Sequence, residues 1–402
     1  MSSQVIVRRF EVHAAEGDLD RIYSALSAAA KQFPHEQLKA DITRHRRSPM
    51  VSARLTGVVA ATSTVRESIS ADPGVRVVND WLDVPAAAQP DAGGGSDFVY
   101  PDQRVLQRID PMECARKEIG SGTQVIVAIV DSGITVDHPD LANRLWTDPG
   151  DRKVHGARCM DGQRDSDVTD QEGHGTMLAG TILATANHIE GIELMPVKFF
   201  DVTTQPAAAN AAAAIRFAIS QQPQPAIINL SFDLGIGSNE LREAFRMAFD
   251  YSDALIVIAA GNTGSDNDQY PLVPASYADA CRDKVIVVMA TDWYDGRPIF
   301  SNFGKTSVDL GAPGVGIVST RALVSRGKES RKYGRYTGTS AAAAHVSGAA
   351  ALLKSQNPDR CAKDIKKLLM DSVDHSPWLK CASGGRLNLS NAACDAKALL
   401  AR

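Results

Sequence analysis

The chain has 402 residues, of which 44% are hydrophobic and 22% are charged, a composition typical of a folded globular protein and not of a disordered one. Its 43 basic and 47 acidic residues nearly balance, so the charge gives no reason to expect nucleic acid or a membrane surface as a partner. We find neither a signal-peptide pattern nor an apolar run near the roughly 18 residues of a membrane span, and we therefore expect a cytoplasmic location.

Residues 1–84 are predicted to form a small domain of their own. Alternating apolar residues indicate strands over 5–12, 51–59 and 75–80, and apolar residues at helical spacing indicate a helix over 18–33. A second, short helix is expected between residues 62 and 74, where Thr62 or Ser63 can cap its start. This order predicts a small α+β, ferredoxin-like domain of the split βαβ type.

Residues 85–98, PAAAQPDAGGGSDF, lack apolar periodicity, which is typical of a flexible linker. The larger domain is predicted over residues 99–402. There, short apolar runs alternate with helical segments, a pattern that indicates an α/β domain with a mostly parallel sheet covered by helices on both faces. The expected strands are 124–130, 193–200, 226–230, 254–260 and 284–290, and the expected helices are 176–186, 207–220, 239–250 and 341–354.

Polar side chains follow three of these strands. Asp131 comes after 124–130, Ser231 after 226–230 and Asn262 shortly after 254–260. Because ligands of open parallel sheets bind at the carboxyl ends of the strands, these residues are candidates for a site. His174 and Ser340 lie at the starts of two predicted helices. Each residue alone is explained by a turn or a helix cap, but an acid, an imidazole and a hydroxyl together form an activated nucleophile.

Four segments around these residues resemble the subtilisin-like serine proteases, or subtilases. They are VAIVDSGI around Asp131, GHGTMLAGTI around His174, IAAGN at Asn262 and GTSAAAAHVSG around Ser340, and the acid, the histidine and the serine follow the family's chain order. With weaker similarities between them, the resemblance covers most of residues 105–357. It implies a three-layer subtilisin-like domain and a serine endopeptidase that needs no cofactor for its chemistry.

The resemblance also implies a role for each residue. Ser340 attacks the scissile carbonyl, and His174 accepts its proton and later returns it. Asp131 orients the imidazole, and Asn262 binds the oxyanion together with the backbone N–H of Ser340. A substrate strand is expected along two backbone segments, which are Ser231, Phe232, Asp233 and Ala259, Ala260, Gly261. His345 is expected to pack elsewhere, because five helical residues turn it about 140° from the hydroxyl.

Three features depart from the family pattern. Ala341 replaces the usual methionine after the nucleophile, so we expect activity that resists peroxide. Asp140 matches a position that often helps to bind calcium, but the segment after the predicted His174 helix looks too short for the partner loop, so a structural calcium is doubtful. Phe232 and Asp233 replace smaller residues. One interpretation is that the ring and the carboxylate narrow the cleft and favour a basic substrate residue. The alternative is that Asp233 turns outward in a surface loop.

Residues 53–84 resemble the propeptide, or inhibitor, domain of the family in their order of strand, helix, Pro-Gly-Val and strand. Such a domain assists folding, inserts its last strand into the cleft and is cut off at its C-terminal end. The resemblance implies autoinhibition by the N-terminal domain and self-cleavage between about Val84 and Asp97. Alternatively, the domain stays attached as a regulatory or docking domain.

The predicted function is therefore hydrolysis of peptide bonds in proteins or peptides through an acyl-enzyme, with the N-terminal domain as an intramolecular inhibitor. Two alternatives stay open. The acyl group can pass to an amine, which gives transpeptidation or macrocyclisation, or the fold can serve as a binding scaffold without catalysis.

Overall fold

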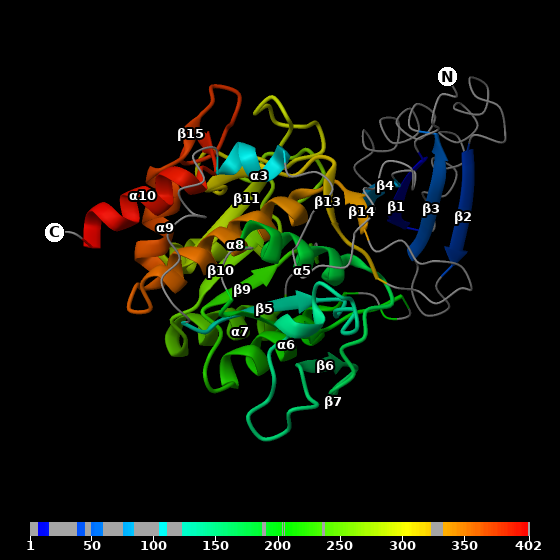
Figure 1. The fold of residues 1–402 in the computed structure, drawn as a ribbon. Coiled ribbons are helices and arrows are strands. Elements are labelled where there is room, and N and C mark those ends of the chain that lie inside the picture. Colours follow the sequence, from blue (N-terminus) through cyan, green and yellow to red (C-terminus); the bar gives the residue numbers. More distant parts are fainter. Residues whose placement is uncertain are drawn as a thin grey trace.

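The computed structural model describes residues 7–15, 38–44, 50–58, 75–83, 104–110, 123–186, 190–202, 204, 206–234, 238–322 and 333–400. Within them lie two β-sheets, a large one with helices on both faces and a smaller one to its side (Figure 1). None of the helices in this described part combines the length and the apolar composition that a membrane span requires.

The strands are β1 (Val7–Ala15), β2 (Leu38–Arg44), β3 (Met50–Val58), β4 (Val75–Asp83), β5 (Val125–Asp131), β6 (Ala157–Met160), β7 (Gln163–Asp165), β8 (Ile192–Lys198), β9 (Ile227–Leu230), β10 (Leu255–Ala259), β11 (Val285–Thr291), β12 (Leu310–Pro313), β13 (Ile317–Thr320), β14 (Tyr333–Tyr336), β15 (Asp374–His375) and β16 (Gly385–Arg386). The α-helices are α3 (Arg104–Ile109), α5 (His174–Thr185), α6 (Ala208–Ser220), α7 (Asn239–Tyr251), α8 (Thr339–Gln356), α9 (Ala362–Asp371) and α10 (Leu389–Leu400). Two 3₁₀ segments are η4 (Ala142–Arg144) and η5 (Ala275–Lys284).

The large sheet has ten strands in the order β15-β16-β12-β11-β10-β9-β5-β8-β6-β7. From β16 to β6 in this order, each strand pairs in parallel with the next one. The pairs at the two ends of the sheet, β15 with β16 and β7 with β6, are antiparallel. The parallel register places the carboxyl ends of β5, β9 and β10 at one edge of the sheet. This edge carries the candidate site.

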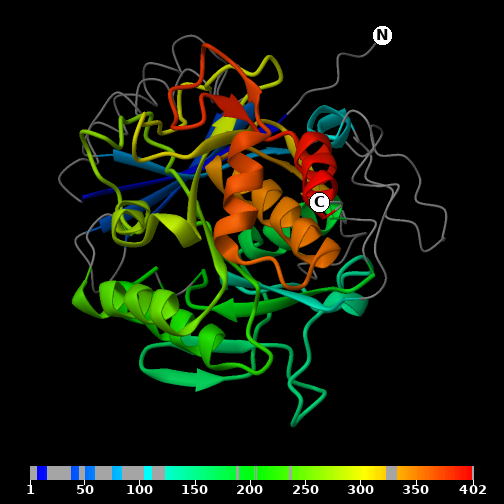
Figure 2. The same ribbon diagram turned by 90° about the vertical axis from the view of Figure 1, so that its left-hand side faces the viewer.

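The two faces of the large sheet are covered because its central strands are apolar on both sides. In β5, Val125, Val127 and Ile129 pack with α5 and α8, whereas Ile126, Ala128 and Val130 pack with α6 and α7. This alternation follows from the two-residue period of a strand and produces a three-layer α/β domain (Figure 2). The predicted α/β fold with a mostly parallel sheet is confirmed.

All nine elements predicted for the larger domain are present within two or three residues of their predicted bounds. Sequence patterns did not predict the short strands β6, β7 and β12 to β16. Each has four residues or fewer, which is too short for an alternating pattern to be recognised.

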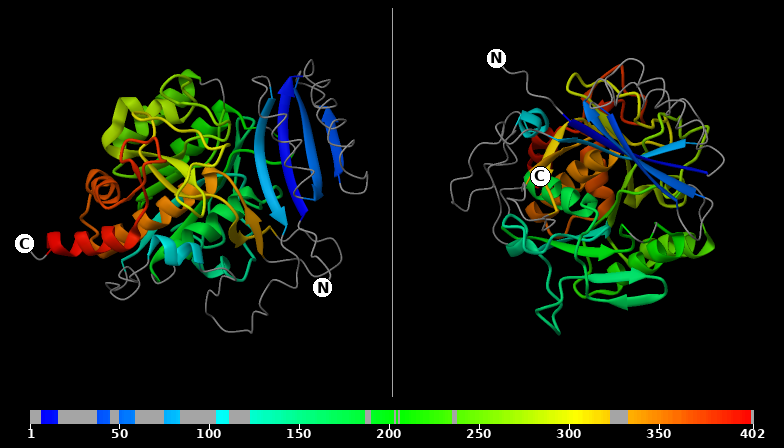
Figure 3. Two further views of the ribbon diagram at one scale, coloured as in Figure 1. Left: turned by 90° about the horizontal axis from the view of Figure 1, so that it is seen from above. Right: turned by 90° about the vertical axis from the view of Figure 1, so that its right-hand side faces the viewer.

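Strands β1 to β4 belong to the second sheet, whose order is β13-β14-β4-β1-β3-β2. All its pairs are antiparallel, and β4 joins β14 in the register Leu82 to Arg335 and Trp81 to Tyr336 (Figure 3). The strands predicted over 5–12, 51–59 and 75–80 are thus observed as β1, β3 and β4. The two predicted helices and the linker over 85–98 lie outside the described residues, so the ferredoxin-like domain and the division into 1–84, 85–98 and 99–402 stay predictions.

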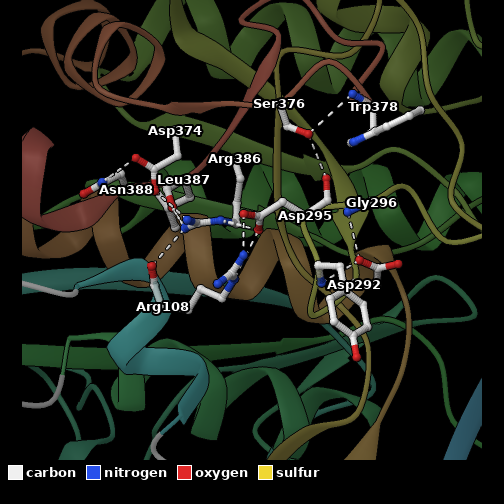
Figure 4. Close-up of polar contacts among 11 residues, drawn as sticks. Arg108, Asp292, Asp295, Gly296, Asp374, Ser376, Trp378, Arg386, Leu387 and Asn388 are labelled. Atoms are coloured by element: carbon white, nitrogen blue, oxygen red, sulfur yellow. Dashed lines mark hydrogen bonds and ion pairs between the residues drawn. The ribbon is translucent and has the colours of Figure 1, made fainter.

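Helix α3 is attached to the C-terminal part of the chain by a cluster of charged side chains, the Arg386 cluster (Figure 4). Arg386 is buried, and its guanidinium forms ion pairs with Asp295 and Asp374 and donates to the carbonyl of Arg108 over 3.0 Å. Arg108 of α3 pairs in turn with Asp295 over 2.6 Å. A buried guanidinium needs such acceptors, because removing it from water without them is costly.

Candidate active site

The predicted catalytic residues all lie at the carboxyl edge of the large sheet. Asp131 is the last residue of β5, and Asn262 follows β10 within three residues. His174 is the first residue of α5 and Ser340 the second residue of α8. These two helices pack against each other on one face of the sheet.

Two glycines allow the end of β5 to approach the start of α5. Gly133 has φ +105°, and a Cβ there would lie 2.3 Å from the Val168 carbonyl oxygen. A Cβ on Gly175 would lie 2.1 Å from the carbonyl oxygen of Gly133. Any side chain at these positions would force the two backbones apart. The motifs DSG and GHG therefore bring Asp131 and His174 close together.

Asp131 and His174 form a direct hydrogen bond. The Asp131 side chain is fully buried, and its Oδ1 accepts from His174 Nδ1 over 2.9 Å and from the Ser132 backbone N–H over 2.8 Å. Because a carboxylate can only accept, Nδ1 carries the proton, and Nε2 of the neutral ring is left as the basic nitrogen. This is the arrangement that a general base requires.

The Ser340 hydroxyl donates to the Ser231 carbonyl oxygen over 3.3 Å, not to His174. The structure therefore joins the acid to the imidazole by a hydrogen bond but not the imidazole to the nucleophile. Rotation about χ1 of Ser340 changes the direction of this hydroxyl without moving the backbone, and catalytic hydrogen bonds often tighten only when substrate binds. The Ser340 N–H lies in the first turn of α8, where N–H groups have no acceptor within the helix.

Asn262 is fixed at the start of α8 by its side-chain oxygen. Oδ1 accepts from the Thr339 N–H over 2.9 Å and from Thr339 Oγ1 over 3.0 Å. These bonds identify the oxygen and leave the amide nitrogen, Nδ2, as the donor for a ligand. The side chain of Asn262 is therefore held at the start of α8, next to the residue before Ser340, where its Nδ2 and the Ser340 N–H could serve as two donors to an oxyanion.

Charges around His174 shift its titration. Burial by itself lowers the pKa of His174, but the charge and the hydrogen bond of Asp131, followed by the charges of Glu172 and Asp170, raise the pKa to about 9. The net shift favours the protonated imidazole, because three carboxylates surround a ring that has little contact with water.

The base role predicted for His174 requires its neutral form, so we expect activity to rise with pH through an ionisation near pH 9. Stability changes in the opposite direction. The stabilisation from protonated His174 is complete below the unfolded value of about 6.5 and is lost as pH rises through about 9. The profile of kcat/KM against pH, measured beside thermal unfolding, tests both. A profile that is already flat just above neutral pH would contradict the prediction.

His345 forms its hydrogen bond with α5 and not with Ser340. Its Nδ1 lies 2.8 Å from the Thr185 hydroxyl, which donates its own proton to the Thr181 carbonyl, so Nδ1 carries the hydrogen. Burial lowers the pKa of His345 to about 3, which keeps the ring neutral. The predicted packing role of His345 agrees with this geometry.

The two segments predicted to bind substrate differ in the groups they leave available. The N–H groups of Ala260 and Gly261 already donate to the Val288 carbonyl and to Thr339 Oγ1. These two N–H groups are therefore not available to an added substrate strand, and a role of Ala259, Ala260 and Gly261 in binding substrate stays a prediction.

In the other segment, the Phe232 ring is buried against Phe199, with the ring centroids 4.6 Å apart. The expectation that this ring narrows a cleft is therefore wrong. Ser231 is buried beside Ser340, and Asp233 is half-buried. A role for these two residues in binding substrate stays a prediction.

The residues described give no support to a calcium site at Asp140. Its Oδ2 accepts a hydrogen bond from the Tyr333 hydroxyl, and the described chain has no group of three or more His, Cys, Asp or Glu side chains arranged to hold a metal ion.

Sequence reasoning missed two residues that touch the site. The Glu172 carboxylate accepts from the His174 backbone N–H over 2.8 Å, and Thr339 binds both Asn262 and the Gly261 N–H. An acidic residue just before a helix start is a signal that could have indicated Glu172. For Thr339, the position one residue before the nucleophile gave no such signal.

An α/β sheet with a carboxylate-held imidazole and a serine at a helix start is the architecture of a serine hydrolase. Residues 122–393 match the Subtilase family. Thermitase of Thermoactinomyces vulgaris is 32% identical over 264 residues, which are 64% of this chain and 84% of that protein. An extracellular serine proteinase of Thermus sp. strain Rt41A is 28% identical over 354 residues, 88% of this chain and 72% of that protein. A solved structure from Pseudoalteromonas arctica PAMC 21717, described as a protease, is similar with a TM-score of 0.62 and 25% identity over 76% of this chain and all of that one.

The chain therefore belongs to the subtilase family and is a subtilisin-like serine endopeptidase, a hydrolase that acts on proteins or peptides. Members of this family need no cofactor for catalysis.

Ala341 follows Ser340, the predicted nucleophile, and is buried in α8. Because alanine has no thioether, hydrogen peroxide has no methionine to oxidise at this position. We expect the protein to retain most of its activity in peroxide, while Ala341→Met is expected to lose it progressively. Activity and intact mass, followed together during exposure, test this. Equal rates of inactivation in the two proteins would contradict it.

Proposed function

We propose that this endopeptidase works through Asp131, His174 and Ser340, with Asn262 as an oxyanion donor. The observation that carries the proposal is the 2.9 Å hydrogen bond from His174 Nδ1 to the buried Asp131 carboxylate, at the sheet edge where α8 presents Ser340. The matching order and content of the family segments support it.

In the first half of the reaction, Ser340 Oγ bonds to the scissile carbonyl carbon as its proton passes to His174 Nε2. The carbonyl oxygen takes up the negative charge and is held by Asn262 Nδ2 and the Ser340 N–H. His174 then gives its proton to the leaving nitrogen as the C–N bond breaks, which leaves an acyl-enzyme.

In the second half, water replaces the amine. It loses a proton to His174 and attacks the ester carbon, and the proton returns to Ser340 Oγ as the C–O bond breaks. Asp131 stays ionised throughout and stabilises the imidazolium that forms twice. The products are a new carboxylate and a free Ser340.

We further propose that the N-terminal residues inhibit the enzyme and that the chain cuts itself between about Val84 and Asp97. The pairing of β4 with β14 supports this inhibition. Strand β14 ends at Tyr336, shortly before Ser340, and β13 pairs with its other edge. A substrate that needs the β14 edge therefore competes with β4 for the same backbone groups.

A fluorophosphonate probe tests the proposal on the purified full chain. Wild type is expected to gain one probe mass, and Ser340→Ala none. Intact mass during incubation is expected to show a new N-terminus within 84–98 in wild type only, with higher peptidase activity after the cut. Labelling without any rise in activity after removal of the N-terminal residues would overturn the inhibitory role alone.

Two other outcomes separate the alternatives. Joined or cyclic products in place of hydrolysed ones, seen by mass spectrometry of a peptide reaction, would identify transfer to an amine. Absence of labelling in correctly folded wild type would overturn the catalytic proposal and leave a binding scaffold.

A further inference from the structure

A buried carboxylate outside the catalytic residues joins the two segments that supply Asp131 and His174. We propose that Asp170 is a positioning residue that holds the imidazole of His174 against Asp131. The inference rests on the proposed function, since it concerns the rate of the same reaction. Asp170 has no direct contact with the reacting atoms, so its action must pass through its neighbours.

Asp170 is 5% exposed and accepts five hydrogen bonds. Oδ1 accepts from Ser132 Oγ over 3.0 Å, from the Glu172 N–H over 3.0 Å and from the Gly173 N–H over 2.7 Å. Oδ2 accepts from Thr176 through its N–H, over 2.9 Å, and its hydroxyl, over 2.6 Å. Hydrogen bonds to an ionised acceptor are stronger than neutral ones, so this carboxylate fixes the segment 172–176 tightly.

One set of these bonds acts on the start of α5. The N–H groups of Gly173 and Thr176 belong to the turn in which His174 lies, and such groups at a helix start have no acceptor within the helix. The Asp170 carboxylate supplies those acceptors. It thereby sets the position and direction of the His174 backbone, from which the imidazole extends.

A second set acts on the end of β5. Ser132 Oγ donates to Asp170 and accepts from the Gly175 N–H over 2.9 Å, while the Ser132 N–H donates to Asp131 Oδ1 over 2.8 Å. Asp170, Ser132 and Asp131 therefore form a continuous chain of contacts. The carboxylate of the catalytic acid and the helix that carries the imidazole are fixed by the same side chain.

The charge of Asp170 provides a separate readout. The groups whose charges act on His174 are Asp131 from β5 and Glu172 and Asp170 from the segment before α5, and all three raise the pKa of His174. Lys198 of β8 lies nearby, with its ammonium 2.7 Å from the Thr169 carbonyl oxygen. Neutralising Asp170 removes one of the three negative charges, so the pKa of His174 is expected to fall.

The test compares wild type with Asp170→Asn, which keeps the shape and removes the charge and one acceptor. Because displacement of a catalytic group by about 1 Å costs on the order of 100-fold in rate, we expect kcat to fall about 100-fold with KM changed little. The ascending limb of kcat/KM is expected to move to lower pH. If Asp170 contributed only to stability, Asp170→Asn would change neither the kcat of the folded enzyme nor the pH of its ascending limb.

Asp309→Asn is the matched control. Asp309 is also buried and accepts from the Val287 N–H over 2.7 Å and from Lys366 over 2.8 Å, but it precedes β12 at the opposite edge of the sheet. This variant is expected to lose stability while its kcat and pH limb match those of wild type. Equal kcat and an unmoved limb in Asp170→Asn and in the control would overturn the inference.

Ser132→Ala keeps the proposal testable even where Asp170→Asn folds poorly. It removes the link from Asp170 to the end of β5, so a smaller loss of kcat is expected, and the double variant should lose less than the product of the single losses. If the loss of kcat in the double variant equalled the product of the two single losses, Asp170 and Ser132 would act independently, and the inference would be contradicted. Fluorophosphonate labelling distinguishes failure of the proposed function from failure of the inference about Asp170. No labelling of wild type refutes the proposed function, whereas equal labelling rates in wild type and Asp170→Asn refute only this inference.

Discussion

Replacement of Ser340 by alanine is expected to lower kcat for a peptide substrate by on the order of 10⁶-fold, with KM nearly unchanged. The variant loses the atom that bonds to the carbonyl carbon, so the imidazole held by Asp131 has no nucleophile to activate. Only the oxyanion donors and substrate binding would continue to assist attack by water. The measurement is kcat from a fluorogenic peptide, with enzyme concentration taken from absorbance because the variant cannot be titrated by the probe.

Ser355→Ala is the control for this variant. Ser355 lies on the same helix, is buried and donates to the Leu352 carbonyl over 2.8 Å, far along α8 from the candidate site. Its replacement by alanine is expected to leave kcat unchanged. If Ser340→Ala kept more than about a thousandth of wild-type turnover, residual catalysis without the nucleophile could not explain it, and Ser340 would lose its assigned role.

Replacement of Asn262 is expected to lower kcat by about 10²- to 10³-fold, again with little change in KM. In the proposed mechanism, the Nδ2 donor acts on the oxyanion, which carries full charge only near the transition state. Alanine, however, also removes the Oδ1 acceptor used by Thr339. Part of the loss in Asn262→Ala could then come from a displaced start of α8.

Asn262→Asp separates these effects. An aspartate keeps an oxygen for the Thr339 N–H and hydroxyl but has no N–H to offer, and its charge repels an oxyanion. We expect it to preserve thermal stability and to lose at least as much kcat as Asn262→Ala. Wild-type kcat in the aspartate variant would show that the amide nitrogen does not serve the reaction.

The elements that sequence patterns predict well are those decided by local physics. Long apolar runs such as 124–130 and 284–290 have a single arrangement that buries both faces, so β5 and β11 follow from the sequence. The candidate residues Asp131 and Asn262 were found because they follow such runs.

What the sequence did not reveal depends on contacts between distant segments. The direction of the Phe232 ring, the use of the Ala260 and Gly261 N–H groups and the bond from Ser340 to Ser231 are each decided by partners far along the chain. The pairing of β4 with β14 joins residues more than 250 positions apart, and no local pattern specifies it. Asp170 was missed for a partly related reason. Four of its five hydrogen bonds come from donors within six residues, but the bond from Ser132, which links Asp170 to the end of β5, forms only when β5 and α5 meet.

The Arg386 cluster connects helix α3 with the C-terminal residues of the part of the chain that carries the candidate site, which is called the catalytic unit below. Arg108 and Arg386 share Asp295, and Ser390 of α10 donates to Asp110 just after α3. A chain shortened before residue 104 keeps these contacts, since none of them involves β1 to β4. A chain that ends before Arg386 lacks the guanidinium that donates a hydrogen bond to the Arg108 carbonyl oxygen. Maturation by loss of the leading residues is thus compatible with an intact catalytic unit, whereas trimming of the tail would release its first helix.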